Sequence, residues 1–304
     1  MAKAGCWVVC LLGALVVVAG AGAVPTTPPP GTPDPSAIVL TAADFPGSSV
    51  DAGGTAGTAT KDIVASYQRG TAFTAPYGAS KYVLLVSTAF VATTATAAGS
   101  EYSLLAHQLS SKSGQAGFVK DFLANGNLKR TDARVGITRP HALGIGDASM
   151  ETGFVFTLVK SKHRTNISLS VIALDRVVVV NVAAGLSSKV VAADAKALAT
   201  VVVAHASAAL VPISVQFPTV SGTALQGQTL TASTGTWGNT PTAYTYQWQD
   251  CDPGGSTCTD IAGATAGTYV VEPTDVGDTL RVQVTAKNRF GSTLSTSSVT
   301  TAAS

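Results

Sequence analysis

The side chains that could act as acids, bases or nucleophiles are few and scattered along this 304-residue chain. Its histidines and glutamates are His107, His141, His163, His205, Glu101, Glu151 and Glu272. There is no Gly-x-Ser-x-Gly elbow, no His-Glu-x-x-His pair and no glycine-rich phosphate loop with its lysine. The sequence therefore predicts a protein that is not an enzyme and that has neither a cofactor nor a metal site.

One catalytic alternative stays open, a hydrolase that acts on the cell wall with an unrecognised active site in residues 36–210. It would use His141 or His107 with an unassigned nucleophile. Such a site requires a histidine within hydrogen-bond reach of both a serine and a carboxylate, in a concave pocket. Spacing along the chain cannot test this, because the four histidines are far apart in sequence.

The densest charged motif is Lys160-Ser161-Lys162-His163-Arg164, which holds three cations and a histidine within five residues. As a ligand-binding element made of Lys160, Lys162, His163 and Arg164, it would attract anionic wall polymers or lipid headgroups. The alternative is a solvated hairpin tip without a ligand.

Aromatic residues alternate along Tyr244, Tyr246 and Trp248. Aromatics in a row can form a platform for sugars. In a two-layer β-fold, however, a tryptophan on a central strand belongs to the core. Tyr246 and Trp248 are therefore predicted to be core aromatics.

Four aspartates lie near that stretch or in the turns that follow it: Asp250, Asp252, Asp275 and Asp278. Carboxylates in such a group can bind calcium. Aspartate also caps turns by accepting hydrogen bonds from nearby backbone N–H groups, and we favour this interpretation.

The N-terminus has the three parts of a secretory signal: Lys3, an apolar run and the small residues Ala21-Gly22-Ala23. We expect residues 1–23 to be a cleaved signal peptide, so that the protein is secreted or lies at the cell surface. The alternative is an uncleaved anchor helix, the one case in which a membrane would be a partner. Cys6 and Cys10 belong to this segment.

The mature chain would keep two cysteines, Cys251 and Cys258. An even pair in an oxidising compartment predicts one disulfide. The loop that it closes is short, so the chain-entropy model gives it about 2.5 kcal/mol.

Charge differs along the chain. Residues 36–210 hold fifteen Lys and Arg against ten Asp and Glu, whereas residues 211–304 hold three against six. Neither region has the concentrated basic stripe that a phosphate backbone requires, which argues against nucleic acid as a partner. A cell-wall polymer or another surface protein is the expected partner.

Three segments must position these residues. Residues 24–35 contain six prolines and predict a linker, a stiff polyproline II stalk. Residues 36–210 predict an α+β extracytoplasmic domain, an antiparallel sheet with helices on one face. The expected elements are a helical turn near 41–47, a strand over 81–91, helices over 95–123 broken near Gly114, strands over 154–160, 166–174 and 177–182, and a helix over 189–210.

Residues 211–304 predict an all-β domain of seven short strands, with clear alternation around Leu280, Val282, Val284 and Ala286. Several of its motifs occur in one order: Val220-Ser-Gly, Gly227-Gln-Thr-Leu, Gly235-Thr-Trp, Tyr246-Gln-Trp and Asp275-Val-Gly-Asp-Thr-Leu. In this order they resemble the immunoglobulin-like repeat of secreted and surface proteins of actinobacteria. The resemblance implies an immunoglobulin-like β-sandwich that serves as a spacer or adhesion module, usually in tandem copies, whereas this chain has one.

Residues 36–210 resemble uncharacterised extracytoplasmic domains of actinobacterial lipoproteins and sensor proteins. The Leu40-Thr-x-x-Asp44-Phe-Pro opening and Gly146-Asp147-x-Ser149 carry this resemblance. It implies an exported α+β domain and no activity. The whole sequence predicts a non-catalytic binding, sensing or surface-associated protein with one accessory module, and a purely structural surface protein is the further alternative.

Overall fold

The computed structural model describes residues 28–45, 49–57, 62–78, 81–186 and 190–304. The expected signal segment, residues 1–23, lies outside them. Among the helices of this described part, none has the length and hydropathy that a membrane span requires. The chain forms two compact units: unit 1 contains Asp34–Ala209, and unit 2 contains Pro29–Pro33 together with Leu210–Ser304.

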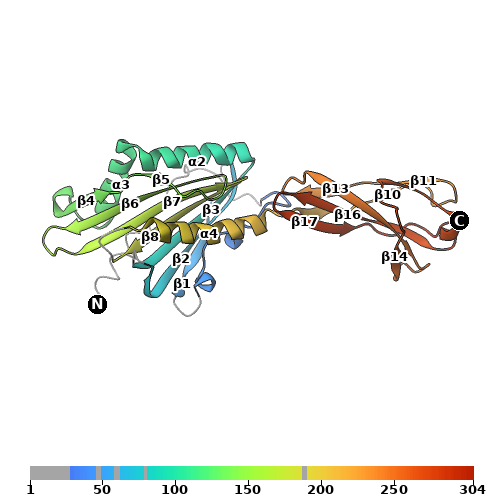
Figure 1. Cartoon of the computed structure of the whole chain (residues 1–304), viewed down its shortest axis with the longest axis horizontal. Coiled ribbons are helices and arrows are strands. Elements are labelled where there is room, and N and C mark those ends of the chain that lie inside the picture. The colour runs from blue at the N-terminus through green and yellow to red at the C-terminus, as the bar shows by residue number, and fades with distance from the viewer. Residues whose placement is uncertain (1–27, 46–48, 58–61, 79–80, 187–189) are drawn as a thin grey trace. The chain divides into compact units, whose positions relative to one another are not determined.

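Unit 1 is built on one eight-stranded antiparallel sheet (Figure 1). Its strands follow the order β1-β2-β3-β8-β7-β6-β4, and the short β5 also pairs with β6. The strands are β1 Ser49–Ala56, β2 Ile63–Tyr77, β3 Tyr82–Ala92, β4 Ala133–Ile137, β5 His141–Ala142, β6 Ala148–Leu158, β7 Arg164–Leu174 and β8 Val177–Gly185. The predicted antiparallel β-structure is confirmed.

The central strands β3, β7 and β8 are buried along most of their length. Both of their faces are covered, so they read as nearly continuous apolar runs, which the sequence pattern located. It did not locate β2, because Gln68, Arg69 and Gly70 interrupt the apolar pattern. Pairing with β3 along almost its whole length holds β2 in the sheet, irrespective of that composition.

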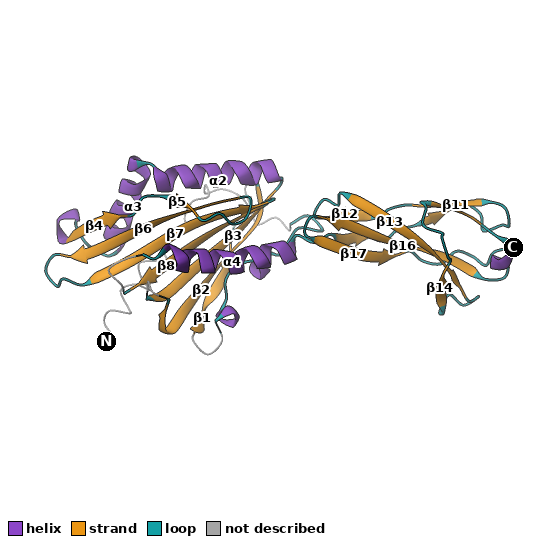
Figure 2. Ribbon diagram, viewed as in Figure 1, coloured by secondary structure: helices purple, strands orange, loops and turns teal. Residues whose placement is uncertain are grey.

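In the described chain, three α-helices pack on this sheet, and Figure 2 distinguishes them from the strands by colour. They are α2 Ala95–Ser110, α3 Lys112–Asn125 and α4 Ala192–Ala209. On β7, Val171 packs in one core cluster with Leu105 of α2, whereas Ile172 packs with Ala195 and Ala199 of α4. Adjacent residues of a strand project to opposite faces, so α2 and α4 cover opposite faces of the sheet.

The prediction that all helices lie on one face is therefore wrong. Leu169, which shares the face of Val171, packs in a cluster with Val119 and Phe122 of α3. We call this side the α2–α3 face and the other side the α4 face. Helical periodicity shows which side of a helix is apolar, but it does not show which face of the sheet that side meets.

The break between α2 and α3 lies at Ser111 rather than near Gly114. Ser111 has an extended backbone (φ −80°, ψ 148°), and its Oγ accepts a hydrogen bond from the Gly114 N–H at 3.1 Å. It is the N-cap of α3, and such a cap satisfies a backbone donor that the first turn leaves unpaired. Gly114 itself lies within the helix.

The two motifs of unit 1 that carry the family resemblance contain aspartates that bond to the backbone of turns. Asp44 is the last residue of a 3₁₀ turn, Ala42–Asp44, and its Oδ2 accepts the Thr41 N–H at 2.7 Å. Asp147 Oδ2 accepts the N–H of Asp175 at 2.7 Å in the turn between β7 and β8. Both aspartates therefore fasten turns, which is the use of aspartate that turn chemistry favours.

Unit 2 contains nine short strands in three antiparallel sheets. The sheets have the orders β14-β13-β16-β17, β10-β11-β15 and β12-β9. The strands are β9 Ile213–Gln216, β10 Val220–Ser221, β11 Thr229–Ala232, β12 Thr236–Gly238, β13 Ala243–Cys251, β14 Cys258–Asp260, β15 Thr268–Val270, β16 Thr279–Asn288 and β17 Gly291–Thr296.

The core of unit 2 joins two of these sheets. Trp248 and Val282 of the four-stranded sheet lie in one cluster with Leu230 and Tyr269 of the three-stranded sheet. The two sheets therefore pack against each other through alternate residues, with polar residues on the outer side of β16. Directly paired residues of β13 and β14, Cys251 and Cys258, form a disulfide with a Cα–Cα distance of 4.0 Å.

The proline-rich segment differs from the expected stalk where the structure describes it. Both the N–H and the hydroxyl of Thr32 donate to the carbonyl of Pro29, at 3.1 and 2.6 Å. Pro30 and Gly31 occupy the centre of this turn, and Gly31 has the positive φ of 77° that position three of a type II turn requires. Pro29–Pro33 thus belong to the fold of unit 2 instead of forming an extended spacer.

Candidate functional site

A groove of about 630 Å³ lies between α3 and β4 on the α2–α3 face. Its size is in the range of small-molecule sites. The lining residues are Lys112, Gln115, Ala116, Val119, Lys120, Leu123, Ala124, Leu128, Arg130, Val135 and Ile137. Seven of them are apolar, three are cationic and none of these described lining residues is acidic.

The groove forms because α3 and β4 pack only at their inner sides. Val119 and Leu123 of α3 are buried against the sheet, whereas Val135 is half-buried and Ile137 is 42% exposed on β4. Apolar side chains that β4 presents beyond the edge of α3 are therefore left for another occupant.

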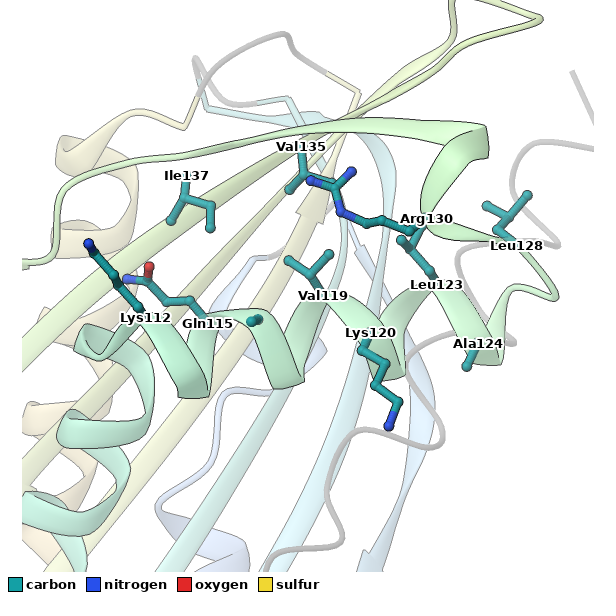
Figure 3. Close-up of a pocket in the computed structure, with 11 residues that line it drawn as sticks. Lys112, Gln115, Val119, Lys120, Leu123, Ala124, Leu128, Arg130, Val135 and Ile137 are labelled. Carbon is teal, nitrogen blue, oxygen red and sulfur yellow. The ribbon is translucent and has the colours of Figure 1, made fainter.

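Two cations lie where they could meet the charged end of a ligand. Arg130 donates from Nη1 to the Ala133 carbonyl at 2.9 Å, which holds its guanidinium and leaves further N–H donors for other acceptors. Figure 3 shows this guanidinium turned toward Val135, and Lys112 near Ile137 at the other end of the view. The Lys120 side chain extends from α3 away from β4.

The predicted cationic motif forms the tip of the hairpin between β6 and β7. Lys160, Lys162, His163 and Arg164 are all exposed. The tip is hydrogen-bonded, because Lys162 N–H donates to the Leu158 carbonyl at 3.0 Å. Lys162 has a φ of 57°, in the left-handed region that non-glycine residues seldom adopt.

The hairpin tip does not line the groove. It lies beside the 3₁₀ turn Arg130–Asp132 that does, since Val159 N–H donates to the Asp132 carbonyl at 2.9 Å. The structure thus brings two basic segments, near 130 and near 162, to the same end of the sheet.

The catalytic alternative can be compared with the surroundings of His141. His141 Nε2 lies 3.3 Å from Glu151 Oε2, outside hydrogen-bond geometry, and Glu151 Oε1 accepts the Ser168 hydroxyl at 2.8 Å. The carboxylate therefore stands between the histidine and the serine. In a Ser-His-Asp triad the imidazole stands in the middle, since it must take the serine proton.

His205 shows the same order of groups. Its Nε2 lies 3.0 Å from Asp44 Oδ1, and Asp44 Oδ2 accepts the Thr41 hydroxyl at 3.1 Å. Among the described residues, no histidine side chain shares a hydrogen bond with a serine or threonine hydroxyl. This geometry does not favour the hydrolase that the sequence left open.

Glu151 is nearly fully buried, and this burial raises the pKa of its carboxyl, against the lowering effects of the Ser168 hydrogen bond and of His141. The residue lies in a polar row that crosses the α4 face. In register, Ser87 of β3 pairs with Asn181 of β8, Asn181 with Ser170 of β7, and Ser170 with Glu151 of β6. In the described part of the chain, the Ser87 hydroxyl and the Asn181 amide have no hydrogen-bond partner.

The aromatic stripe in unit 2 changes from buried to exposed along β13. Trp248 is completely buried, and its Nε1–H donates to the Ala266 carbonyl at 2.9 Å while its ring stacks on Tyr269 at 5.6 Å. Tyr246 packs on the core from its edge, and Tyr244 is 37% exposed. Because Trp248 is buried and Tyr246 packs on the core, the three aromatics do not form an exposed row for sugars.

The aspartates of unit 2 have distinct uses. Asp252 accepts the N–H groups of Ser256 and Thr257 at 2.8 and 3.1 Å, which lowers the pKa of its carboxyl. Asp275 Oδ2 accepts the Tyr269 hydroxyl at 2.8 Å, and burial, together with this bond, raises the pKa of Tyr269. No group of three or more metal-ligating side chains occurs among the residues that the structure describes.

Sequence reasoning did not find the groove. The apolar stripe of α3 was visible in the pattern, but β4 is five residues long and has one apolar residue at each alternate position. The only available signal was the run Lys129-Arg130, which no motif connects to α3. The groove depends on the pairing of β4 with β6, and that pairing is a tertiary property.

No protein-family model matches the chain, and no curated protein matches its sequence. Among solved structures, it is similar to the crystal structure of the extracellular domain of PknH from Mycobacterium tuberculosis, at 9% sequence identity and a TM-score of 0.33. The similarity covers 59% of this chain and 98% of that one. At this level it identifies neither a shared family nor a shared activity.

Proposed function

We propose that the protein is a non-catalytic, exported binding protein whose unit 1 holds an amphipathic anion in the groove between α3 and β4. The ligand class is an apolar chain that ends in a carboxylate or a phosphate. The observation that carries this proposal is the composition of the groove: an apolar floor, cations at its margin and no acidic lining residue in the described chain.

The apolar part of the ligand would cover Val135 and Ile137, which are partly exposed. Removing their exposed surface from water is favourable by about 25 cal/mol for each Å². The charged end would lie at Arg130, whose guanidinium is already held by the Ala133 carbonyl. A cation that is fixed before binding loses less conformational entropy when it pairs with an anion.

Export is supported by the disulfide, since such bonds persist in oxidising compartments. We further propose that unit 2 is a single immunoglobulin-like accessory module, a β-sandwich. The order of its sequence motifs supports this, as does the packing of two antiparallel sheets around a buried tryptophan. In this interpretation unit 2 supports unit 1, and the specific ligand binds to unit 1.

Three probes separate the parts of the proposed ligand: octanoate, which has a chain and a charge, octyl glucoside, which has the chain alone, and acetate, which has the charge alone. We expect titration calorimetry on the full chain to give an affinity for octanoate at least tenfold above that for either other probe. Absence of octanoate binding would contradict the function. Equal binding of octyl glucoside would contradict the role of the cations.

The variant Arg130→Gln tests the position of the charged end. It should weaken octanoate binding by about tenfold, the effect of losing one charge-assisted hydrogen bond. Lys196→Gln removes the same charge from α4, on the opposite face of the sheet, so it should change binding less than twofold. Equal losses in both variants would indicate attraction by net charge alone.

A further inference from the structure

The two basic segments also meet on the α4 face, away from the groove. Arg134 of β4 pairs with Thr157 of β6, and Thr157 pairs with Arg164 of β7. Directly paired residues of antiparallel strands project from the same face, so the two arginines flank Thr157. Two strand spacings place their Cα atoms about 10 Å apart.

The face can be assigned from the next row of the sheet. Val135 pairs with Phe156, and the Phe156 ring lies 4.2 Å from the ring of Phe122 of α3. Since Arg134 precedes Val135 by one residue, it projects to the opposite side of the sheet from α3. Arg134 and Arg164 are both exposed there.

We name Arg134, Arg164, Lys160 and Lys162 the basic edge. Among the described residues, none of these four cations forms an ion pair. Like charges so close together repel one another. An anionic partner would lower the free energy of this surface directly.

Lys162 provides an independent observation. The left-handed backbone of a hairpin tip suits glycine or asparagine, and a lysine there is less stable. A strained residue that carries a charge into solvent is the kind of outlier that points to function. The turn is also held by hydrogen bonds, from Lys162 N–H to the Leu158 carbonyl and from Leu158 N–H to the His163 carbonyl.

From these observations we infer that the basic edge is a second binding site, for a linear polymer that carries phosphate or carboxylate groups. Arg134 and Arg164 would contact anionic groups about 10 Å apart along the polymer. Lys160 and Lys162 would extend the contact to the tip of the hairpin between β6 and β7. The site is separate from the groove, because the two lie on opposite faces of the sheet. Guanidinium pairs suit both anions, so the chemistry alone does not choose between them.

The test uses the full chain with inorganic polyphosphate and with poly-L-glutamate as probes, at two salt concentrations. We expect saturable binding of at least one probe that weakens as salt rises, since exposed ion pairs are screened. Binding of polyphosphate alone or of polyglutamate alone assigns the anion, and binding of both supports the shared chemistry. Binding of neither probe would overturn the inference.

Lys162→Gly separates function from stability. It should raise the midpoint of thermal unfolding, because glycine relieves the backbone strain, and it should weaken polymer binding several-fold. If Lys162 has no role in binding, the variant will raise the midpoint of thermal unfolding and leave polymer binding unchanged. The double variant Arg134→Gln/Arg164→Gln should weaken binding at least tenfold, while Lys120→Gln, on the other face, should leave it within twofold of the unaltered chain. If all variants bind the polymer as tightly as the unaltered chain, the proposal is wrong.

Discussion

Ser87 and Ser168 lie on the same face of the sheet, yet their hydroxyl groups have opposite surroundings. The Ser168 hydroxyl donates to Glu151 at 2.8 Å, whereas the Ser87 hydroxyl is buried without a partner in the described chain. A buried hydroxyl that lacks a hydrogen bond loses its contact with water and gains nothing in return. The two serines should therefore respond in opposite directions to the same substitution.

We predict that Ser87→Ala raises the free energy of unfolding by about 1 kcal/mol, because it removes an unsatisfied polar atom. Ser168→Ala should lower it by about 2 kcal/mol, because it deprives a buried carboxylate of a donor. Urea denaturation followed by circular dichroism measures both. A loss of stability in Ser87→Ala would show that this hydroxyl has a partner, such as a bound water.

Asp250 and Asp252 are two residues apart, and the pKa values of their carboxyl groups are shifted in opposite directions. Burial and the neighbouring charges of Asp278 and Asp275 raise the pKa of Asp250, whereas backbone N–H donors lower the pKa of Asp252. A raised pKa means that the ionised form is disfavoured in the fold, so stability from this group increases as pH falls through its folded pKa. A lowered pKa has the reverse effect, and stability is lost as pH falls.

We predict that Asp250→Asn has a higher unfolding midpoint than the unaltered chain at pH 7, with a difference that shrinks as pH falls through the raised pKa. Asp252→Asn should have a lower midpoint at pH 7, and that difference should disappear at acidic pH. Thermal unfolding followed by the fluorescence of Trp248 would report both. Shifts of the same sign at pH 7 would contradict the assignment.

Among the elements, α3 has the clearest local determinant. Its N-cap Ser111 offers a hydroxyl to the Gly114 N–H, while the preceding Ser110 has only a weak bond, at 3.4 Å, to the His107 carbonyl. Because α3 forms one wall of the groove, the position of its first turn also affects the site. A cap is therefore relevant here to both stability and binding.

We predict that Ser111→Ala destabilises unit 1 by about 1 kcal/mol, the usual effect of removing a cap. It should also weaken octanoate binding, since Lys112 and Gln115 lie in the turn that the cap holds. Ser110→Ala is the matched control and should change stability by less than 0.5 kcal/mol, as a surface substitution does. If both variants lose the same free energy of unfolding, Ser111 does not stabilise α3 as its N-cap.

At the scale of the whole molecule, the chain passes between the two units twice from Pro29 onward. Pro29–Pro33 belong to unit 2, the chain then builds unit 1 from Asp34 to Ala209, and it returns at Leu210. A Cβ atom added to Gly31 would lie 2.7 Å from the Gly238 Cα. Residues that are far apart in sequence thus share one fold.

We predict that Gly31→Ala destabilises unit 2 by about 2 to 4 kcal/mol, through the positive φ and the overlap with Gly238. Gly227→Ala is the control, since Gly227 has a similar φ of 82° but no atom within 4 Å of an added Cβ. It should cost about 1 kcal/mol. Unfolding of unit 2 can be followed by the fluorescence of Trp248. If Gly31→Ala and Gly227→Ala destabilise unit 2 equally, Pro29–Pro33 do not pack on it.

The sequence by itself determined the features that depend on local pattern. Alternation located β13 and β16, an apolar run located β3, β7 and β8, and an even pair of cysteines indicated the disulfide. The signal segment and the family resemblances remain predictions, since they rest on residues outside the described chain or on motifs that no comparison matches.

Tertiary structure decided which separate segments meet. It placed α4 on the face opposite α2, joined β4 to β6 so that the groove could form, and set Arg134 in one row with Arg164. It also placed the Glu151 carboxylate between His141 and Ser168. The physical reason is common to all of these: periodicity fixes which side of an element is apolar, but strand pairing and packing fix which partner covers that side. The candidate sites of this protein depend on those partners.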